Sequence, residues 1–512
     1  SLIYRFKRAN LMVMAIAKIM GIETEYGIMS NGTDSQYQNP MTSSGLLINA
    51  YLHGSRTEFD FADETPAQDA RIEVNEPPSI FPETHLINAM LTNGARYYVD
   101  HAHPEYASPE VSNALEAVLY DRAGEEILRR SMLEAKNIID GEIIVYKNNT
   151  DSKGNSYGTH EGYLVQRNVP FTTLVNSLTS HFVSRQIFCG AGKVGSELHA
   201  SNNKVDFQIS QRADFMEEPV GLETTMKRPI VNTRDEPHSD ASKYRRLHII
   251  VGDANMCDVS TFLKLGTTAI ILAMIEDDFE DFNNNLCVLV EPVKSIKEIS
   301  HDTTLKVKVE TNKGFMTALD IQKSILDSAK KYISSCTSEQ IELIGGNIAH
   351  EILNRWEDVL AKLETNPESL SGQVDWITKK KIIDGFKLRD NLEANDPKLC
   401  GIDVQYHDIR KGKLFDKMRI RGEIEALVSD KEIVNSVDNP PETTRAYFRG
   451  SVLKKFAKNV HSANWDSVTL DIGSSTLKRI PMMEPTRGNK DSVQGLLDSC
   501  DTPIELINKL EE

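Results

Sequence analysis

The chain has 512 residues, of which 40% are hydrophobic and 26% are charged, and its formal net charge is −17. A chain of this length can form one large core and a smaller second domain, because single cores stop growing near about 250–300 residues. Its acidity argues against general nucleic-acid binding, which requires a basic surface.

The six cysteines lie far apart in the sequence and form no Cys-x-x-Cys pair. Scattered thiols in a long acidic chain are typical of a reducing compartment and not of a disulfide framework. We therefore expect a cytoplasmic protein whose thiols are buried and structural.

The N-terminal segment has basic residues, Arg5, Lys7 and Arg8, before a short apolar run over 11–17. This order resembles a secretory signal, but the run is short and ends at Lys18. We favour an N-terminal extension over 1–17, with Met14 as a plausible start. A second apolar run, 269–275, is far below the ~18–20 residues that span a bilayer, so it predicts a buried helix and no membrane segment.

Strands dominate the first half of the chain and helices the second. The stretch 54–86 is acidic, contains prolines and lacks a sustained period, so it predicts a long mobile loop. Hydrophobic periodicity predicts strands over 19–28, 95–100, 141–146, 161–166, 207–210, 229–232 and 246–251, and helices over 41–53, 258–276 and much of 319–390. This order indicates an α+β domain built on an antiparallel sheet.

A turn-rich Asp-Asn-Pro-Pro segment at 438–441 marks a domain boundary. We predict a large domain over 18–437 and a small C-terminal domain over 438–512. About 70 residues can fold, although a domain of that size is marginal alone.

Two glutamates, Glu23 and Glu25, share one face of the first predicted strand, because strand side chains alternate between faces. Glutamate is depleted in strands, so two on one face need an explanation. The pattern fits an edge strand that faces solvent. It equally fits a magnesium site, since Mg²⁺ prefers carboxylate oxygens.

The segment 93–106 carries a denser set of ionisable groups. Arg96, Tyr98 and Asp100 share a strand face, and Pro104 should end the strand because it cannot donate to a ladder. Arginine suits phosphate oxygens, while Asp100 and Glu105 suit magnesium or acid–base chemistry. A polar surface strand with ion pairs is the alternative.

Four further residues fit the same chemistry. His160 begins a strand after a loop rich in Asn, Gly and Ser, Arg246 and His248 share the polar face of a later strand, and Arg212 is another cation. A lone histidine is more often structural. Four strands that each place ionisable groups on one face are harder to dismiss together.

Long motifs at 21–27, 93–106, 148–151 and 232–248 are similar to those of the Pup ligase/depupylase family, where Pup is the prokaryotic ubiquitin-like protein. The resemblance runs from about Lys18 to the C-terminus. It implies a glutamine-synthetase-like α+β fold, in which an antiparallel sheet forms a concave nucleotide-binding cradle backed by helices, plus a small C-terminal domain.

The family has a ligase branch and a deamidase/depupylase branch. The long stretch between Glu25 and Arg96, the Asp-His-Ala-His-Pro-Glu segment at 100–105 and the segment 221–228 resemble the second branch. That branch is an ATP- and Mg²⁺-dependent hydrolase that cleaves the isopeptide bond between Pup and target lysines and deamidates the C-terminal Gln of Pup. The alternatives are a Pup–protein ligase, a more distant glutamate–amine ligase and a non-catalytic Pup-binding scaffold.

The resemblance also implies a role for each site residue. Asp100 matches the catalytic aspartate, as base or as nucleophile. Residues that match metal positions are Glu23, Tyr98, Glu105, His160 and His248. Residues that match ATP contacts or neutralise phosphate are Arg96, Ser108, Arg212, Arg246 and Trp465.

The implied partners are Pup and pupylated proteins, with neither nucleic acid nor membrane. Acidic Pup should bind a basic groove. Basic residues cluster at 379–381, 410–413 and 445–455. Each cluster could line that groove or simply form a solvated helix face.

Overall fold

The computed structural model describes residues 15–53, 57–61, 64, 68–71, 87–197, 205–394, 396–473 and 476–511. Residues 1–14 of the predicted extension lie outside the described residues. So does most of the predicted loop over 54–86, whose mobility therefore stays a prediction.

The architectural centre is a ten-stranded sheet with the order β13-β8-β1-β6-β5-β4-β3-β16-β17-β18. Its strands are β1 (Met20–Glu25), β3 (Thr57–Phe59), β4 (Asn88–Met90), β5 (Arg96–Asp100), β6 (His103–Ala107), β8 (Thr159–Gln166), β13 (Tyr244–Ile249), β16 (Val460–Ala463), β17 (Ser467–Leu470) and β18 (Lys478–Pro481). All neighbours are antiparallel except β3 and β16, which are parallel. The predicted α+β class is confirmed, and the sheet is mixed at this one pair.

Smaller two-stranded sheets flank the large one. They are formed by β2 (Gly27–Asn31) with β7 (Glu142–Tyr146), β9 (Lys193–Val194) with β10 (Phe207–Gln208), β11 (Met216–Gly221) with β12 (Arg228–Asn232), and β14 (Lys308–Thr311) with β15 (Gly314–Thr317). The strand predicted over 19–28 is thus two strands that belong to different sheets, β1 and β2.

The prediction that Pro104 ends a strand is wrong. β5 ends at Asp100, a two-residue turn follows, and Pro104 is the second residue of β6, opposite Val99. The turn residues His101 and Ala102 both have left-handed φ, 49° and 103°. Two-residue hairpins of this hand match the twist of the strands they join.

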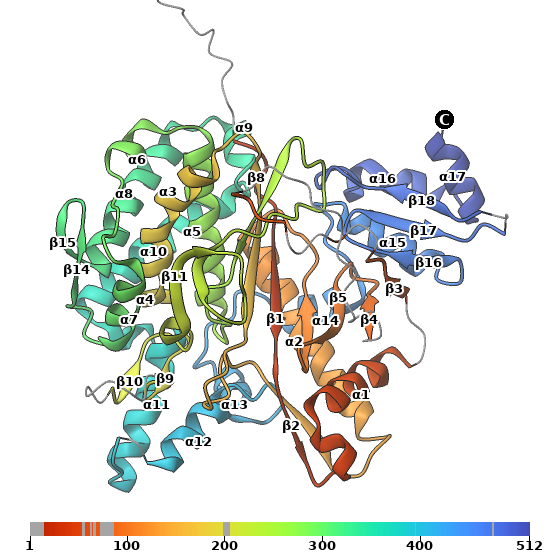
Figure 1. Ribbon diagram of the computed structural model, residues 1–512. Helices are drawn as coiled ribbons and strands as arrows, with labels where there is room; N and C mark the ends of the chain where they lie inside the picture. Colours follow the sequence, from red (N-terminus) through yellow and green to blue (C-terminus); the bar gives the residue numbers. More distant parts are fainter. Residues whose placement is uncertain are drawn as a thin grey trace, which may run out of the picture.

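Helices pack against the sheet and lie to both sides of strand β1 in the view of Figure 1. The longer ones are α1 (Pro40–Leu52), α2 (Ala114–Ala135), α3 (Phe171–Ser184), α5 (Asp258–Glu276), α7 (Pro292–His301), α8 (Ala318–Ser335), α10 (Asn347–Thr365), α11 (Asp375–Asp390), α12 (Pro397–Tyr406) and α14 (Asp430–Asp438). Helix α5 is long and apolar enough to cross a membrane by length and composition, yet every residue of it is buried inside the protein. It is therefore the core helix that the sequence predicted.

The C-terminal elements lie on the opposite side of the molecule from α8 and α10 (Figure 1). They comprise α15 (Ala446–Lys455), strands β16–β18, α16 (Lys490–Asp498) and α17 (Pro503–Glu511). These elements have their own hydrophobic core, which also takes in Phe59 of β3 and Met90 of β4. The domain boundary near 438 stays a prediction, and the described strands continue one sheet across it.

Candidate active site

The first ionisable set lies where β1, β8 and β13 run side by side. Glu23 of β1 is paired with His160 of β8, and His248 lies on the adjacent strand β13. Glu23 Oε2 is 3.5 Å from His160 Nδ1 and 4.0 Å from His248 Nε2. Their ligating atoms all lie within 4.8 Å of one another, so these three residues, the imidazole set, could hold one cation.

Within the imidazole set, the negative charge of Glu23 is compensated by Arg246. Arg246 donates a hydrogen bond to Glu23 Oε1. Burial opposes ionisation, but Arg246 and the two histidines hold the pKa of Glu23 well below its usual range. Burial, followed by the charge of Arg246, lowers the pKa of His248 well below its ordinary value. The ring is therefore neutral at pH 7, the state in which imidazole binds metals.

A second group, the carboxylate set, comprises Glu25, Asp100 and Glu105, whose oxygens also lie within 4.8 Å of one another. Strand pairing brings them together, since Glu105 is opposite both Glu25 and Tyr98. Tyr98 Oη donates to Glu105 Oε1, while the buried Glu105 Oε2 has no hydrogen-bond partner among the described residues. The resemblance did not assign Glu25 to a site, although its place on the face of Glu23 pointed to one.

The carboxylates of this set differ in protonation. Burial and then the charges of Asp100 and Glu25 raise the pKa of Glu105 well above its usual value. For Asp100, burial acts in the same upward direction. The hydrogen bond and charge of His101, whose Nδ1 is 2.7 Å from Asp100 Oδ1, outweigh it and lower the pKa.

The carboxylate set fits a hard cation such as Mg²⁺. It offers oxygen ligands alone, and an added positive charge would both relieve the repulsion at Glu105 and partner its unsatisfied oxygen. The imidazole set, with one carboxylate and two imidazole side chains, suits a cation that accepts nitrogen ligands.

A pocket lies beside the imidazole set and contains several predicted nucleotide contacts. Its lining includes Glu23, Ser108, Arg246 and Trp465, as well as His238. Ser108 Oγ accepts a hydrogen bond from the Ile22 backbone N–H at 3.0 Å, so this hydroxyl also fixes β1 against β6. The structure thus brings three of the five predicted ATP contacts to one pocket.

Arg96 is placed differently. Its guanidinium carbon lies 3.9 Å from the ring centroid of Phe59 and 4.0 Å from that of Tyr98. It also donates to Asn88 (2.9 Å) and Glu64 (3.3 Å). Arg96 does not line the pocket that contains Ser108 and Trp465, so its nucleotide contact stays a prediction.

Arg212 is deeply buried, with 1% of its surface exposed, and does not line the pocket that contains Ser108 and Trp465. Its Nη1 donates to Thr159 O at 2.8 Å and to Gly252 O at 3.3 Å. Asp253 accepts from its backbone N–H and fixes the turn. Burial, then the charge of Arg228, lowers the pKa of Arg212 to about 10. Such a guanidinium favours a nearby anion.

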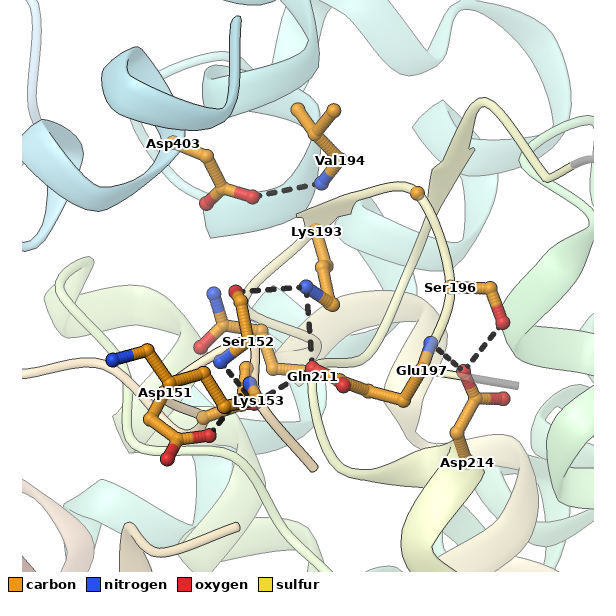
Figure 2. Close-up of polar contacts among 12 residues, drawn as sticks. Asp151, Ser152, Lys153, Lys193, Val194, Ser196, Glu197, Gln211, Asp214 and Asp403 are labelled. Carbon is orange, nitrogen blue, oxygen red and sulfur yellow. Dashed lines mark hydrogen bonds and ion pairs between the residues drawn. The ribbon is translucent and has the colours of Figure 1, made fainter. Parts of the chain in front are cut away.

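The loop over 148–156 forms a wall next to Arg212. The β9–β10 hairpin holds it, since Lys193 Nζ donates to Ser152 Oγ at 3.2 Å and pairs with Glu197 at 3.3 Å (Figure 2). Asp214 in turn accepts from the Glu197 backbone N–H at 3.0 Å. These contacts attach the loop to the β9–β10 strand pair and the segment that follows β9.

The predicted basic groove is wrong for several of its residues. Lys379 is fully buried and pairs with Asp403 at 2.6 Å. Arg445 and Arg449 are buried and both pair with Glu110. Long-range packing converts these cations into structural ion pairs, which a local run of basic residues cannot reveal.

Comparison with known proteins gives a consistent result. The family model described as Pup-ligase protein matches residues 18–469. The depupylase of Acidothermus cellulolyticus is 44% identical over 96% of this chain and 99% of its own. In Mycolicibacterium smegmatis, the Pup deamidase/depupylase is 41% identical over 96% of this chain and 99% of its own, whereas the Pup–protein ligase is 35% identical over 94% and 99%.

Two solved structures match along most of the chain. The complex between Pup and its ligase PafA has a TM-score of 0.79 and 33% identity, covering 97% of this chain and 94% of PafA. PafA in complex with ADP has a TM-score of 0.73 and 34% identity, covering 83% and 96%. These matches agree with the resemblance drawn from the motifs.

Proposed function

This chain belongs to the Pup-ligase protein family, and we propose that within it the chain is a Pup deamidase/depupylase. It hydrolyses the isopeptide bond between Pup and target lysines, and it converts the C-terminal Gln of Pup to Glu. Identities of 44% and 41% to relatives that carry this name exceed the 35% identity to a ligase and favour the hydrolytic branch. Its partners are accordingly Pup and pupylated proteins.

The carboxylate set is the observation that carries this function. Hydrolysis of an amide needs a positioned nucleophile and stabilisation of the developing oxyanion. The lowered pKa of Asp100 keeps it ionised at neutral pH. Asp100 can either take a proton from water, which then adds to the amide carbonyl, or add directly and form an anhydride that water opens. In both routes the amide nitrogen leaves with an added proton.

The chain binds a nucleotide, and ATP is the form we propose. The related PafA has been solved with ADP, and the pocket with Ser108, Arg246 and Trp465 offers a polar side chain, a cation and an aromatic ring. Arg212 and Arg246 would neutralise phosphate charge, and Arg96 would contact the nucleotide once released from Glu64.

We assign Mg²⁺ to the carboxylate set, with Glu105 and Glu25 as ligands and Tyr98 orienting Glu105. When bound, Mg²⁺ supplies positive charge beside the carboxylates and phosphates. Glu23, His160 and His248 would hold a further cation. All six cysteines are free thiols, which supports the cytoplasm as the compartment.

The test is a gel assay with a Pup–protein conjugate, Mg²⁺ and ATP. Wild-type protein should release the free target, and Asp100→Asn should not. New conjugates made from Pup that ends in Glu, without release, would assign the chain to the ligase branch. Nucleotide binding without either reaction would leave a Pup-binding scaffold.

A further inference from the structure

Two arginine side chains donate hydrogen bonds to backbone carbonyls of one short segment, residues 156–159, which also contacts Glu25 of the carboxylate set. Arg228, the first residue of β12, donates from Nη2 to Ser156 O at 2.8 Å. Three residues further along, Thr159 O accepts from Arg212 Nη1 at 2.8 Å. Between these two contacts, the Gly158 backbone N–H donates to Glu25 Oε2 at 3.3 Å. Arg228, Glu25 and Arg212 therefore all bond to backbone groups of the four residues 156–159.

Both guanidiniums have donors that no protein group uses. The Nε atoms of Arg212 and Arg228 are each buried and lack a hydrogen-bond partner among the described residues. An unsatisfied buried donor on a charged group costs more than a neutral one. Burial lowers the pKa of Arg228, and the two cations repel each other. The charge of Glu25 offsets part of this cost, and an anion that also accepts from the free Nε donors would offset the rest.

The substrate of the proposed reaction carries such an anion. The scissile amide is on the side chain of a C-terminal residue, so the α-carboxylate of that residue is free. Its carbon lies four carbon–carbon bonds from the attacked carbonyl carbon, and it is ionised at neutral pH. The carboxylate set would repel it, so a cation is needed within a few ångströms of that set.

We propose that Arg228 binds the free α-carboxylate of the C-terminal residue whose side-chain amide is hydrolysed. The inference rests on the proposed function and adds the group that recognises a chain terminus. Arg212 is less suited, because it is only 1% exposed and its Nη1 is held by two carbonyls. Arg228 is half-buried, stands at the start of a strand, and can be reached from outside.

A phosphate oxygen is the other anion that this pair could hold, so the test pairs enzyme variants with substrate variants. Wild type and Arg228→Gln are assayed for deamidation of Pup that ends in Gln with a free carboxylate and of Pup that ends in Gln with a terminal carboxamide. With wild type, the carboxamide should lower kcat/KM about 10- to 100-fold, as expected for loss of a charge-assisted bidentate contact. Arg228→Gln should show a similar loss with the free carboxylate and little further loss with the carboxamide.

The proposal is overturned if Arg228→Gln and the terminal carboxamide each lower kcat/KM independently, so that their effects multiply. Such a result would mean that the guanidinium and the α-carboxylate do not contact each other. A raised KM for ATP in Arg228→Gln, with full discrimination between the two substrates, would assign Arg228 to phosphate and also overturn it. Arg228→Lys should restore part of the discrimination, and Lys227→Gln, on the exposed neighbour, should leave it unchanged. Equal melting temperatures exclude misfolding. Wild type that hydrolyses neither substrate would contradict the proposed function itself.

Discussion

The imidazole set and the carboxylate set lie on the same sheet but are electrostatically opposite. In the first, Arg246 donates directly to Glu23, and the histidine at 248 is neutral. In the second, no lysine or arginine among the described residues forms an ion pair with Glu25, Asp100 or Glu105. In the first set an arginine forms a direct ion pair, whereas in the second Arg212 and Arg228 act on Glu25 without an ion pair and the burial and repulsion at Glu105 remain. The difference teaches that an added positive charge would be stabilised more at the carboxylate set than at the imidazole set.

The largest expected effect comes from Asp100→Asn, which sharpens the comparison by removing a carboxylate of its set whose pKa is lowered. We expect kcat to fall about 10²–10⁴-fold, the range for loss of a general base, or further if Asp100 is the nucleophile. Single-turnover deamidation at saturating ATP measures it. Glu58→Gln, an exposed change on β3, is the control and should keep full activity.

Removal of Mg²⁺ should lower the melting temperature through the carboxylate set and not through the imidazole set. Adding Mg²⁺ at about 100 times its Kd should stabilise the protein by about 2.7 kcal/mol, because it binds only the folded state. Melting in Mg²⁺ against chelator gives the shift. Glu105→Gln should abolish the shift and His160→Ala should preserve most of it. The reverse pattern would place Mg²⁺ at the imidazole set.

Matched glutamate-to-glutamine changes should move the stability of the metal-free protein in opposite directions. Glu105→Gln removes a buried, repelled carboxylate and should raise the free energy of unfolding. Glu23→Gln leaves Arg246 without its anionic partner and should lower the free energy of unfolding. Urea unfolding in chelator measures both. If both variants changed the free energy of unfolding in the same direction, the contrast between the two sets would be wrong.

The smallest effect is a dependence of stability on pH. Glu105 has a raised pKa in the folded state, so folding takes up a proton above the unfolded value of 4.5. Its contribution to stability is therefore greatest at low pH and is lost as pH rises through the folded pKa. Between about pH 5 and about pH 8, metal-free wild type should lose more stability than Glu105→Gln. If the free energy of unfolding of wild type and of Glu105→Gln fell in parallel with pH, the pKa of Glu105 would not be raised in the folded protein.

Local periodicity predicted those parts of the site that lie within single strands. Alternation correctly placed Glu23 with Glu25, and Arg246 with His248, on shared faces, because the two-residue period of a strand needs no distant information. The two-residue turn before His103 was missed, since hairpins of that hand usually carry Asn-Gly and here carry His-Ala.

Features that depend on distant segments were beyond the sequence. Lys379 is part of a basic run, and only its packing against Asp403 reveals that it is internal. Arg228 was noted only as the end of a motif, because its neighbours Ser156 and Arg212 come from other elements. The resemblance supplied the grouping of residues, and the structure added which donors and acceptors remain unpaired.

The parallel pair of β3 with β16 has a consequence for synthesis. Ser462 lies opposite Glu58, so the sheet joins segments about 400 residues apart in sequence. Nearly the whole chain must be synthesised before β3 and β16 can pair, and Trp465 completes the pocket with Ser108 and Arg246 only after that. Until that moment β3 has one open edge, which is a site for pairing with other chains. Nascent chains of this enzyme thus complete the pocket with Ser108 and Trp465 late in synthesis, and the edge of β3 stays open to other chains until then.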